Sequence, residues 1–179
     1  FVSSIFKKLN KVPCFYSDFE AKKIMNENQL IKKQIISILG PESYIGDKLN
    51  NEYIRKKIFY SQNKLNMINK LVHNQVKINF RKWLSNQNSK YVLKETAILF
   101  EHNFQYEVDL TLLVTAPLKV RIERIIKRDN ISKKTIEKII ENQWSDKEKT
   151  HLSDFFIENL NKSNTIKKVK NLVEIFSSL

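Results

Sequence analysis

Glycine, cysteine and proline are scarce in this sequence of 179 residues, and their scarcity excludes several classes of site. Only two glycines, one cysteine and three prolines are present. The single cysteine, Cys14, cannot form a disulfide within the chain, and three scattered histidines cannot complete a zinc-type cluster with it. We therefore expect a reducing, cytoplasmic setting and no metal site built from protein side chains alone.

Long apolar runs are also missing. The most continuous one, residues 110–118, contains two threonines and a proline. It falls well short of the roughly 20 residues that a membrane helix needs, so we expect no membrane segment. The first residue is Phe1 rather than Met, and no charged and apolar leader follows it. We therefore expect the sequence to begin inside a gene product.

Acidic residues are outnumbered by basic ones. The 32 Lys and Arg residues exceed the 19 Asp and Glu residues and give a net charge of +13. This balance suits a polyanionic partner, and nucleic acid is the first that it suggests. However, the basic residues are spread along almost the whole chain, and the abundance of Lys, Asn and Ile is typical of AT-rich coding bias. The pattern favours a solvated basic surface with a phosphate site over a dedicated nucleic-acid face.

The order of apolar segments predicts an α/β protein with a parallel sheet. Strands are predicted at residues 12–17, 91–99, 110–116 and 155–158, and each is separated from the next by more than a hairpin turn. Residues 91–99 and 110–116 lack polar alternation, as strands buried on both faces do. Helices are predicted at residues 1–10, 18–26, 29–39, 51–60, 62–85, 118–128, 132–144 and 147–152, followed by a final apolar-striped helix.

Polar residues near the carboxyl ends of the predicted strands are candidates for the site, because ligands of open parallel sheets bind there. These residues are Asp18, Glu95 with Glu101, and Asn159. Asp18 is the best candidate for handling a proton, since a carboxylate there accepts a hydroxyl hydrogen or positions a metal. The alternative is that Asp18 caps the helix that follows it.

A row of arginines is the second candidate feature. Arg121, Arg124 and Arg128 are spaced three and four residues apart and share one helical face. Guanidinium forks match phosphate oxygens, so the row suits a phosphate group. The alternative is a solvated face in which these arginines pair with Glu123 and Asp129.

The two glycines, Gly40 and Gly46, span a stretch that superficially resembles a phosphate-binding loop. Such a loop needs four residues between its glycines and then Lys-Ser/Thr, between a strand and a helix. Here five residues intervene, Asp47 precedes Lys48, and the stretch follows a predicted helix. We therefore exclude it as a phosphate loop.

Taken in order, these segments resemble the dephospho-CoA kinase family (CoA, coenzyme A) over essentially the whole chain. The resemblance rests on the order and spacing of several motifs rather than on one decisive motif. The matching segments are Val12-Pro13 through Ser17-Asp18 to Ala21-Lys22, Gly46-Asp47-Lys48-Leu49-Asn50-Asn51 with Ile58-Phe59, Leu71-Val72-His73-Asn74, Glu95 through Phe100-Glu101, Val108-Asp109 through Ala116-Pro117, Arg124 with Arg128-Asp129, and Gln143, Lys149, Asp154 and Asn159.

The resemblance implies a three-layer, parallel-sheet P-loop kinase-like core with a helical substrate-binding insert and a helical lid. The core would comprise residues 1–24, 90–118 and 150–179, the coenzyme A-binding insert residues 25–89, and the lid residues 119–149. It also implies a first strand and a Gly-x-x-x-x-Gly-Lys-Ser/Thr loop ahead of Phe1, with that strand between residues 91–99 and 110–116. Neither is present in this chain, so we expect it to be an inactive fragment as written.

The resemblance implies ATP-dependent phosphorylation of the ribose 3′-hydroxyl of dephospho-CoA, which gives CoA, with Mg²⁺ bridging the β- and γ-phosphates of ATP. Its implied roles are catalysis for Asp18 and Arg128, nucleotide contact for Arg124, Gln143 and Asn159, and substrate contact for His73, Glu95 and Glu101. For His73, bonding to backbone at a helix end is the alternative.

The chain departs from the family pattern at several positions. Asn51 replaces an Arg, Asn74 and Ala97 each replace a Pro, and no Gly follows Asp129. The loss of the Arg puts one substrate-phosphate contact in doubt. Two rival functions stay open: another nucleoside or nucleotide kinase of the same superfamily, and a non-enzymatic nucleic-acid binder on a decayed kinase scaffold.

Overall fold

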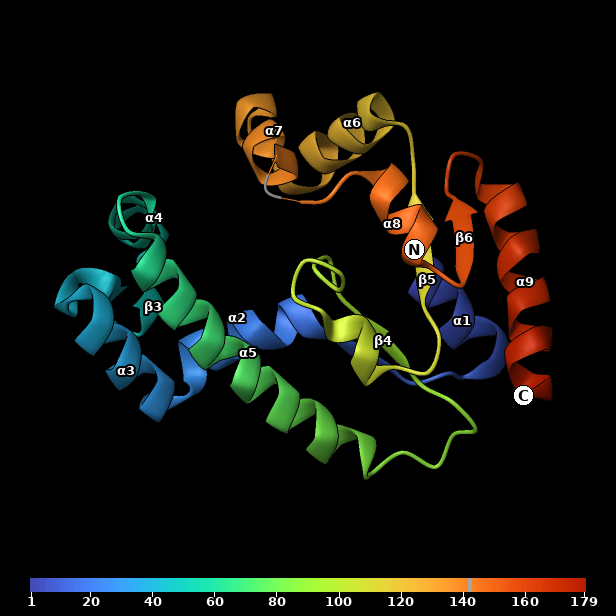
Figure 1. The fold of residues 1–179 in the computed structure, drawn as a ribbon, viewed down its shortest axis with the longest axis horizontal. Helices are drawn as coiled ribbons and strands as arrows, with labels where there is room; N and C mark the ends of the chain where they lie inside the picture. The colour runs from blue at the N-terminus through green and yellow to red at the C-terminus, as the bar shows by residue number, and fades with distance from the viewer. Residues whose placement is uncertain (142) are drawn as a thin grey trace. The chain divides into compact units, whose positions relative to one another are not determined.

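The computed structural model describes residues 1–141 and 143–179 and has an α/β architecture (Figure 1). Two compact units are formed, one by Phe1–Val12 with Ala97–Leu179 and one by Pro13–Thr96. In chain order the elements are α1 (Val2–Asn10), β1 (Cys14–Tyr16), α2 (Ser17–Glu27), α3 (Gln29–Leu39), η1 (Pro41–Ser43), β2 (Tyr44–Ile45), β3 (Lys48–Leu49), α4 (Asn51–Phe59), α5 (Gln62–Leu84), β4 (Leu93–Glu95), η2 (Phe104–Glu107), β5 (Leu112–Thr115), α6 (Leu118–Asp129), α7 (Lys133–Glu141), α8 (Asp146–Leu152), β6 (Phe155–Glu158) and α9 (Lys162–Ser178).

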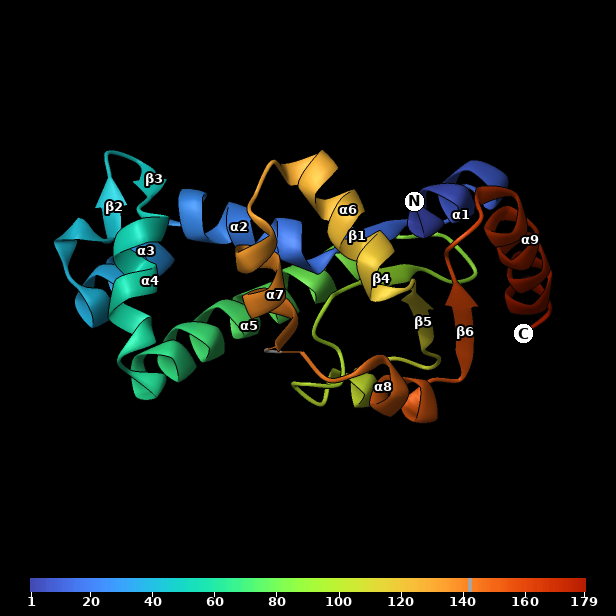
Figure 2. The ribbon, with the colours of Figure 1, turned by 90° about the horizontal axis from the view of Figure 1, so that it is seen from above.

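The unit Pro13–Thr96 combines a parallel strand pair with helices. Strands β1 and β4 pair in parallel, with Cys14 opposite Leu93 and Tyr16 opposite Glu95. The short antiparallel hairpin β2–β3 lies beside α3 and α4 (Figure 2). Apolar residues spaced by three and four along the helices bury one continuous core, made of Phe15, Ile24, Ile31, Ile35, Leu39, Ile68, Val72 and Val76.

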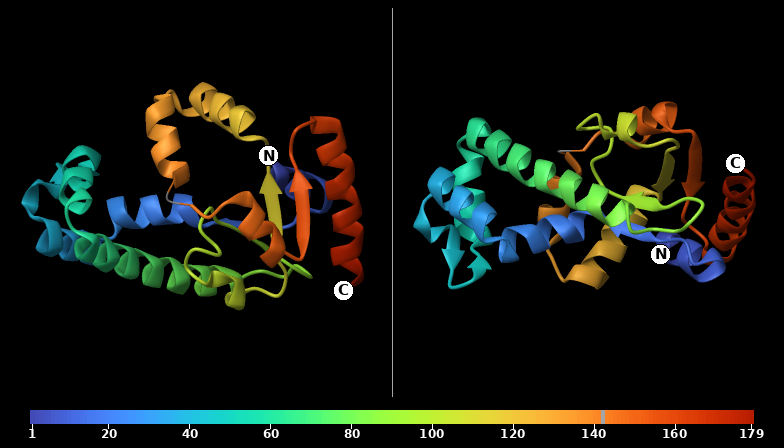
Figure 3. Two further views of the ribbon diagram at one scale, coloured as in Figure 1. Left: turned by 45° about the horizontal axis from the view of Figure 1, so that its top comes forward. Right: turned by 90° about the horizontal axis from the view of Figure 1, so that it is seen from below.

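The other unit is built around a second parallel pair. Strands β5 and β6 run in the same direction, with Leu112 opposite Phe155, and α9 follows alongside (Figure 3, left). Helix α1 packs on α9, where the rings of Phe6 and Phe176 stack with centroids 6.1 Å apart. The Phe176 ring also meets Phe155 edge-on at 5.1 Å, so α9 joins the strand pair to α1.

Side-chain caps fix where several helices begin. In each case an oxygen of the residue before the helix accepts a hydrogen bond from a backbone N–H of the first turn, which has no partner within the helix. The capping residues are Asn28 for α3, Asn50 for α4, Ser61 for α5, Ser145 for α8 and Asn161 for α9. At α8 the side chain of Glu148 also returns to the Ser145 backbone N–H, which completes a capping box.

Gly40 ends α3 in a conformation that other residues rarely adopt, with φ of 107°. A Cβ atom at this position would lie 2.8 Å from the hydroxyl oxygen of Tyr53. That hydroxyl donates a hydrogen bond of 2.9 Å to the carbonyl oxygen of Leu39, so it does not move aside freely. Both the backbone angle and the close contact therefore require glycine.

The helix predictions are largely confirmed. The predicted helix at 29–39 matches α3, and those at 51–60, 62–85 and 118–128 match α4, α5 and α6 within one residue at each end. The predicted helix at 132–144 is shorter, because α7 ends at Glu141; residue 142 of that prediction lies outside the described residues. The hairpin β2–β3 and the two 3-10 helices were not predicted from the sequence.

The four strand predictions are right in place, and residues 155–158 match β6, but the other three predicted strands are too long. Residues 91–99 reduce to β4 and residues 110–116 to β5. The prediction that these two strands are buried on both faces is wrong, since Val114 is 40% exposed and Glu95 is also exposed. Among the described residues the strands form two separate parallel pairs, β1–β4 and β5–β6, and no pairing joins β4 to β5. A strand between these two therefore stays a prediction.

The predicted core, insert and lid boundaries also stay a prediction, because the two compact units follow packing within the chain rather than functional parts. No helix in the described part of the chain has both the length and the apolar character needed to cross a membrane.

Candidate functional site

Asp18 lies one residue past the end of β1, in the first turn of α2. Strand β1 ends at Tyr16, which rather than Asp18 is the N-cap residue of α2 and makes no side-chain capping hydrogen bond. The alternative interpretation of Asp18 as a helix cap is therefore wrong. Because Tyr16 is paired with Glu95, the last residue of β4, the start of α2 and Glu95 belong to the same edge of the β1–β4 pair.

Asp18 is an exposed residue, but neighbouring atoms shield its carboxyl group in part from water. Burial raises the pKa of the Asp18 carboxyl above its usual value, and the nearby Lys22 ammonium group lowers it only in part. The preceding residue, Ser17, is buried, and its hydroxyl has no hydrogen-bond partner within the described residues. A carboxylate with a raised pKa at the end of a strand is suited to accept a proton.

His73 lies near the middle of α5 and is half-buried. The alternative proposed for it, a histidine bonding to backbone at a helix end, is therefore wrong. Its role as a substrate contact stays a prediction, as does that of Glu95.

The three arginines of α6 do not converge on one point. Arg121 makes a two-pronged contact with Asp146 of α8, with both N···O distances at 3.1 Å. Arg128 instead grips the adjacent Asp129 through Nε and Nη2, at 2.7 and 2.6 Å, and is largely exposed. The predicted pairing with Asp129 is confirmed for Arg128, while Arg121 pairs with an acidic residue that the local sequence did not suggest.

Arg124 and Asn159, two predicted nucleotide contacts, lie together. The guanidinium of Arg124 donates to the carbonyl oxygens of Asn159 at 2.5 Å and of Leu160 at 3.1 Å. The Asn159 side chain in turn contacts the hydroxyl of the buried Thr165, which fixes its orientation at the start of α9. Arg124 thus holds the loop between β6 and α9, a contact that only the fold reveals.

Gln143, the third predicted nucleotide contact, is half-buried, and its backbone N–H donates to the carbonyl oxygen of Ile140 at 2.9 Å. Its predicted role concerns the side chain and stays a prediction.

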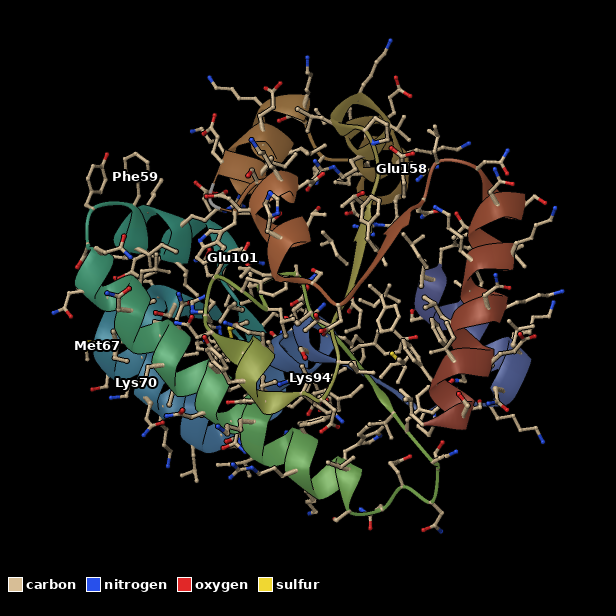
Figure 4. The ribbon with its side chains drawn as sticks, turned by 45° about the vertical axis from the view of Figure 1, so that its right-hand side comes forward. Phe59, Met67, Lys70, Lys94, Glu101 and Glu158 are labelled. Carbon is tan, nitrogen blue, oxygen red and sulfur yellow. The ribbon has the colours of Figure 1, made fainter. Side chains whose placement is uncertain are left out.

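The side chain of Glu101 is only 9% exposed (labelled in Figure 4). Its Oε1 atom lies 2.6 Å from Nζ of Lys149 and accepts the backbone N–H of Trp144 at 3.0 Å. Burial acts to raise the pKa of Glu101, but the bonds from Lys149 and Trp144 outweigh it and the pKa is lowered. Sequence reasoning matched Lys149 to the family but did not pair it with Glu101.

Asp154 joins the beginnings of β5 and β6. Its Oδ2 atom accepts both the backbone N–H and the hydroxyl of Thr111, each at 2.7 Å. These two bonds, the hydroxyl first, hold the pKa of Asp154 below its usual value. The matched position therefore has a structural explanation within the strand pair.

Two other features do not mark the site. Within the described residues, no group of three or more His, Cys, Asp and Glu side chains is arranged to hold a metal ion. A shallow groove of about 340 Å³ lies along α3 and α5 and contains none of the predicted site residues. Its lining residues are Leu30, Ile31, Lys33, Gln34, Leu71, Asn74, Gln75 and Ile78.

Comparisons with known sequences point to one family. A family model described as dephospho-CoA kinase matches residues 1–165. The dephospho-CoA kinase of Bacteroides fragilis is 35% identical over 163 residues, covering 90% of this chain and 80% of that protein. The one of Fusobacterium nucleatum is 34% identical, covering 87% of this chain and 83% of that protein.

Solved structures agree on the fold. A protein of Thermus thermophilus superposes with a TM-score of 0.85 at 22% identity, covering 97% of this chain and 88% of that one. A dephospho-CoA kinase of Campylobacter jejuni superposes with a TM-score of 0.66 at 19% identity, covering 99% and 92%.

Proposed function

Because this chain belongs to the dephospho-CoA kinase family, we propose that it carries residues for ATP-dependent phosphorylation of the ribose 3′-hydroxyl of dephospho-CoA, the step that yields CoA. The observation that carries the proposal is the position of Asp18. Its carboxyl group lies at the start of α2, beyond the end of β1, without a capping role and with a raised pKa. These properties support a proton acceptor at the ligand-binding edge of a parallel strand pair.

In the proposed reaction, Asp18 accepts the proton of the 3′-hydroxyl as that oxygen attacks the γ-phosphorus of ATP. The new O–P bond forms in line with the bond that breaks, and ADP leaves with the electron pair of the broken bond. A raised pKa makes Asp18 a stronger base toward the hydroxyl proton.

The lid arginines complete the proposal on the phosphate side. Arg128 exchanges its exposed contact with Asp129 for the phosphoryl group being transferred, whose charge its fork matches. Arg124, Gln143 and Asn159 lie on the nucleotide side, and His73, Glu95 and Glu101 on the acceptor side. These assignments rest on the family motif, position by position.

The described side chains offer few ligands for a Mg²⁺ ion. Since no three acidic or imidazole side chains gather in the described residues, we propose a Mg²⁺ held mainly by the phosphate oxygens and water, with few protein ligands. When bound, it would neutralise charge on the β- and γ-phosphates. Proton acceptance and orientation remain with Asp18 and the arginines.

We further propose that the 179 residues by themselves have no ATP-dependent kinase activity. Holding the phosphates of ATP as P-loop kinases do requires two glycines with four residues between them, and Gly40 and Gly46 do not satisfy this pattern. A cytoplasmic location remains a prediction from the single cysteine.

An acceptor screen tests the function. The full-length protein that carries these residues is supplied with ATP and Mg²⁺ and offered dephospho-CoA, nucleosides or nucleoside monophosphates, with the 179-residue chain alone as a second arm. We expect phosphorylation of dephospho-CoA by the first arm only. Preference for a nucleoside or its monophosphate would favour the rival kinase, and turnover by the 179 residues would refute the proposed dependence on a phosphate loop. No ATP turnover together with salt-sensitive RNA binding would favour the nucleic-acid binder.

A further inference from the structure

Glu101 contacts the beginning of α8 from two directions. The backbone N–H of Trp144 comes from the residue before the Ser145 cap, and Lys149 lies in the helix four residues after that cap. These two positions of a capped helix lie on the same side, as in the hydrophobic staple that often links them. Here a single carboxylate oxygen, Oε1 of Glu101, takes the place of that apolar contact.

The pair is buried rather than a surface salt bridge. The side chains of Glu101 and Lys149 are 9% and 11% exposed, and their charged atoms are 2.6 Å apart. Breaking such a pair leaves a buried charge without compensation, so the start of α8 is held to the turn that carries Glu101. That turn is itself closed by a hydrogen bond of 2.8 Å from the Phe104 N–H to the carbonyl oxygen of Leu99.

The second carboxylate oxygen is the unusual feature. Oε2 of Glu101 is buried, yet it has no hydrogen-bond partner within the described residues. Buried polar atoms without a partner are rare in folded proteins and call for an explanation. Because the charge of Lys149 balances that of Glu101, Oε2 suits a neutral donor such as a hydroxyl or N–H group, and it would repel a phosphate.

We propose that Glu101 and Lys149 are positioning residues of the predicted lid. Oε1 fixes the start of α8, and Oε2 accepts a hydrogen bond from a hydroxyl or N–H group of dephospho-CoA. Binding of this substrate therefore tightens the same turn that anchors α8. The inference rests on the proposed function for the identity of the donor, but the anchoring of α8 by Oε1 does not depend on it.

The two oxygens are tested separately in the full-length protein. Glu101→Gln can keep an oxygen toward Lys149 and Trp144 while it replaces the free acceptor by a donor. Since a hydrogen bond to a charged group is lost, we expect dephospho-CoA binding, measured by calorimetry, to weaken roughly 10- to 100-fold. The Trp144 amide should keep its protection from hydrogen exchange within a few fold.

Lys149→Met tests the anchor without any ligand, with Lys147→Met as its matched control. Lys147 is an exposed residue of the same helix. We expect the Trp144 amide to exchange about tenfold faster in Lys149→Met, because a local hydrogen-bonded anchor is lost. Lys147→Met should exchange like the parent.

Several results would overturn the inference. If Glu101→Gln binds dephospho-CoA as tightly as the parent, Oε2 has no role in substrate binding. If the Trp144 amide exchanges equally fast in Lys149→Met and Lys147→Met, the Glu101–Lys149 pair does not anchor α8. If Lys149→Met fails to fold, the apolar double variant Glu101→Leu, Lys149→Met should fold again; a protected Trp144 amide in it would refute the anchor. If the parent does not bind dephospho-CoA, the proposed function and the role of Oε2 fail together, while the anchor is still measured.

Discussion

Lys32 of α3 makes two hydrogen bonds to Asp47, at the tip of the β2–β3 hairpin. Its Nζ atom lies 3.0 Å from Oδ1 of Asp47 and 3.0 Å from the carbonyl oxygen of the same residue. The Lys32 side chain is 9% exposed and that of Asp47 is 96% exposed. The ammonium group is therefore a buried donor that fixes an exposed turn to the helix core.

Lys32→Met should loosen this turn. The methionine replaces the buried stem but not the two bonds, and because Asp47 is exposed no buried charge is left behind. We expect the free energy of unfolding to fall by about 1 kcal/mol. Urea unfolding measures the change, and Lys33→Met on the adjacent exposed position should alter it by less than about 0.5 kcal/mol. Equal effects of the two variants would contradict the role assigned to Lys32.

Asp18→Asn should keep the fold and nucleotide binding of the full-length protein while lowering turnover by roughly 10²- to 10⁴-fold, the usual contribution of a positioned acid or base. Steady-state assays with dephospho-CoA measure this effect. Glu27→Gln, at the exposed end of the same helix, is the control and should be neutral. Turnover within a few fold of the parent would exclude Asp18 as the proton acceptor.

The raised pKa of Asp18 also has a consequence for stability. The folded state binds this proton more tightly than the unfolded state, so the free energy of unfolding falls as pH rises from the usual carboxyl pKa through the folded pKa. Asp18→Asn removes that loss. The variant should therefore be at least as stable as the parent at neutral pH, and the difference should vanish below the usual carboxyl pKa.

Arg128→Ala should depress turnover more than ATP affinity, because the guanidinium gains most from charge on the phosphoryl group in transfer. Comparing kcat with the ATP dissociation constant separates the two effects. Lys127→Ala removes a neighbouring exposed cation of the same helix and serves as the control. If ATP affinity alone fell, Arg128 would be a ground-state contact.

The lowered pKa of Glu101 predicts acid sensitivity. Its contribution to stability is fully present above the usual carboxyl pKa of about 4.3 and is lost as pH falls through the lower folded pKa. The parent should exceed Glu101→Gln in free energy of unfolding at neutral pH, and this advantage should shrink on acidification. Chemical denaturation across that pH range measures it. A constant difference would mean that Glu101 is not charged in the folded protein.

Local signals made the helices predictable from the sequence. Helix α3 has an Asn28 cap, a stripe of isoleucines and Gly40 as its stop, and all three act within one or two turns. All four predicted strands were placed correctly and residues 155–158 match β6, but the other three were predicted too long, because an apolar run does not show where backbone pairing ends. The hairpin β2–β3 was missed since its strands have two residues each, too few to show alternation.

The candidate site was harder to predict because its contacts join distant parts of the chain. Asp18 was found from its place after an apolar run, a local feature. The bond of Lys149 to Glu101 and that of Arg124 to the Asn159 carbonyl depend on turns that bring separate elements together. A helical spacing places three arginines on one face, but it does not show that each meets a different partner.

The two glycines have unequal evolutionary freedom. Gly46 has φ of 57°, and a Cβ atom added there would meet no described atom within 4 Å, so Asn or Asp could replace it in a single step. Gly40 meets both an unfavourable φ and the Tyr53 hydroxyl, so no single substitution there relieves both. Loss of the hydroxyl at residue 53 would remove the close contact but not the φ of 107°, so residue 40 stays restricted to glycine as long as the turn keeps this backbone conformation.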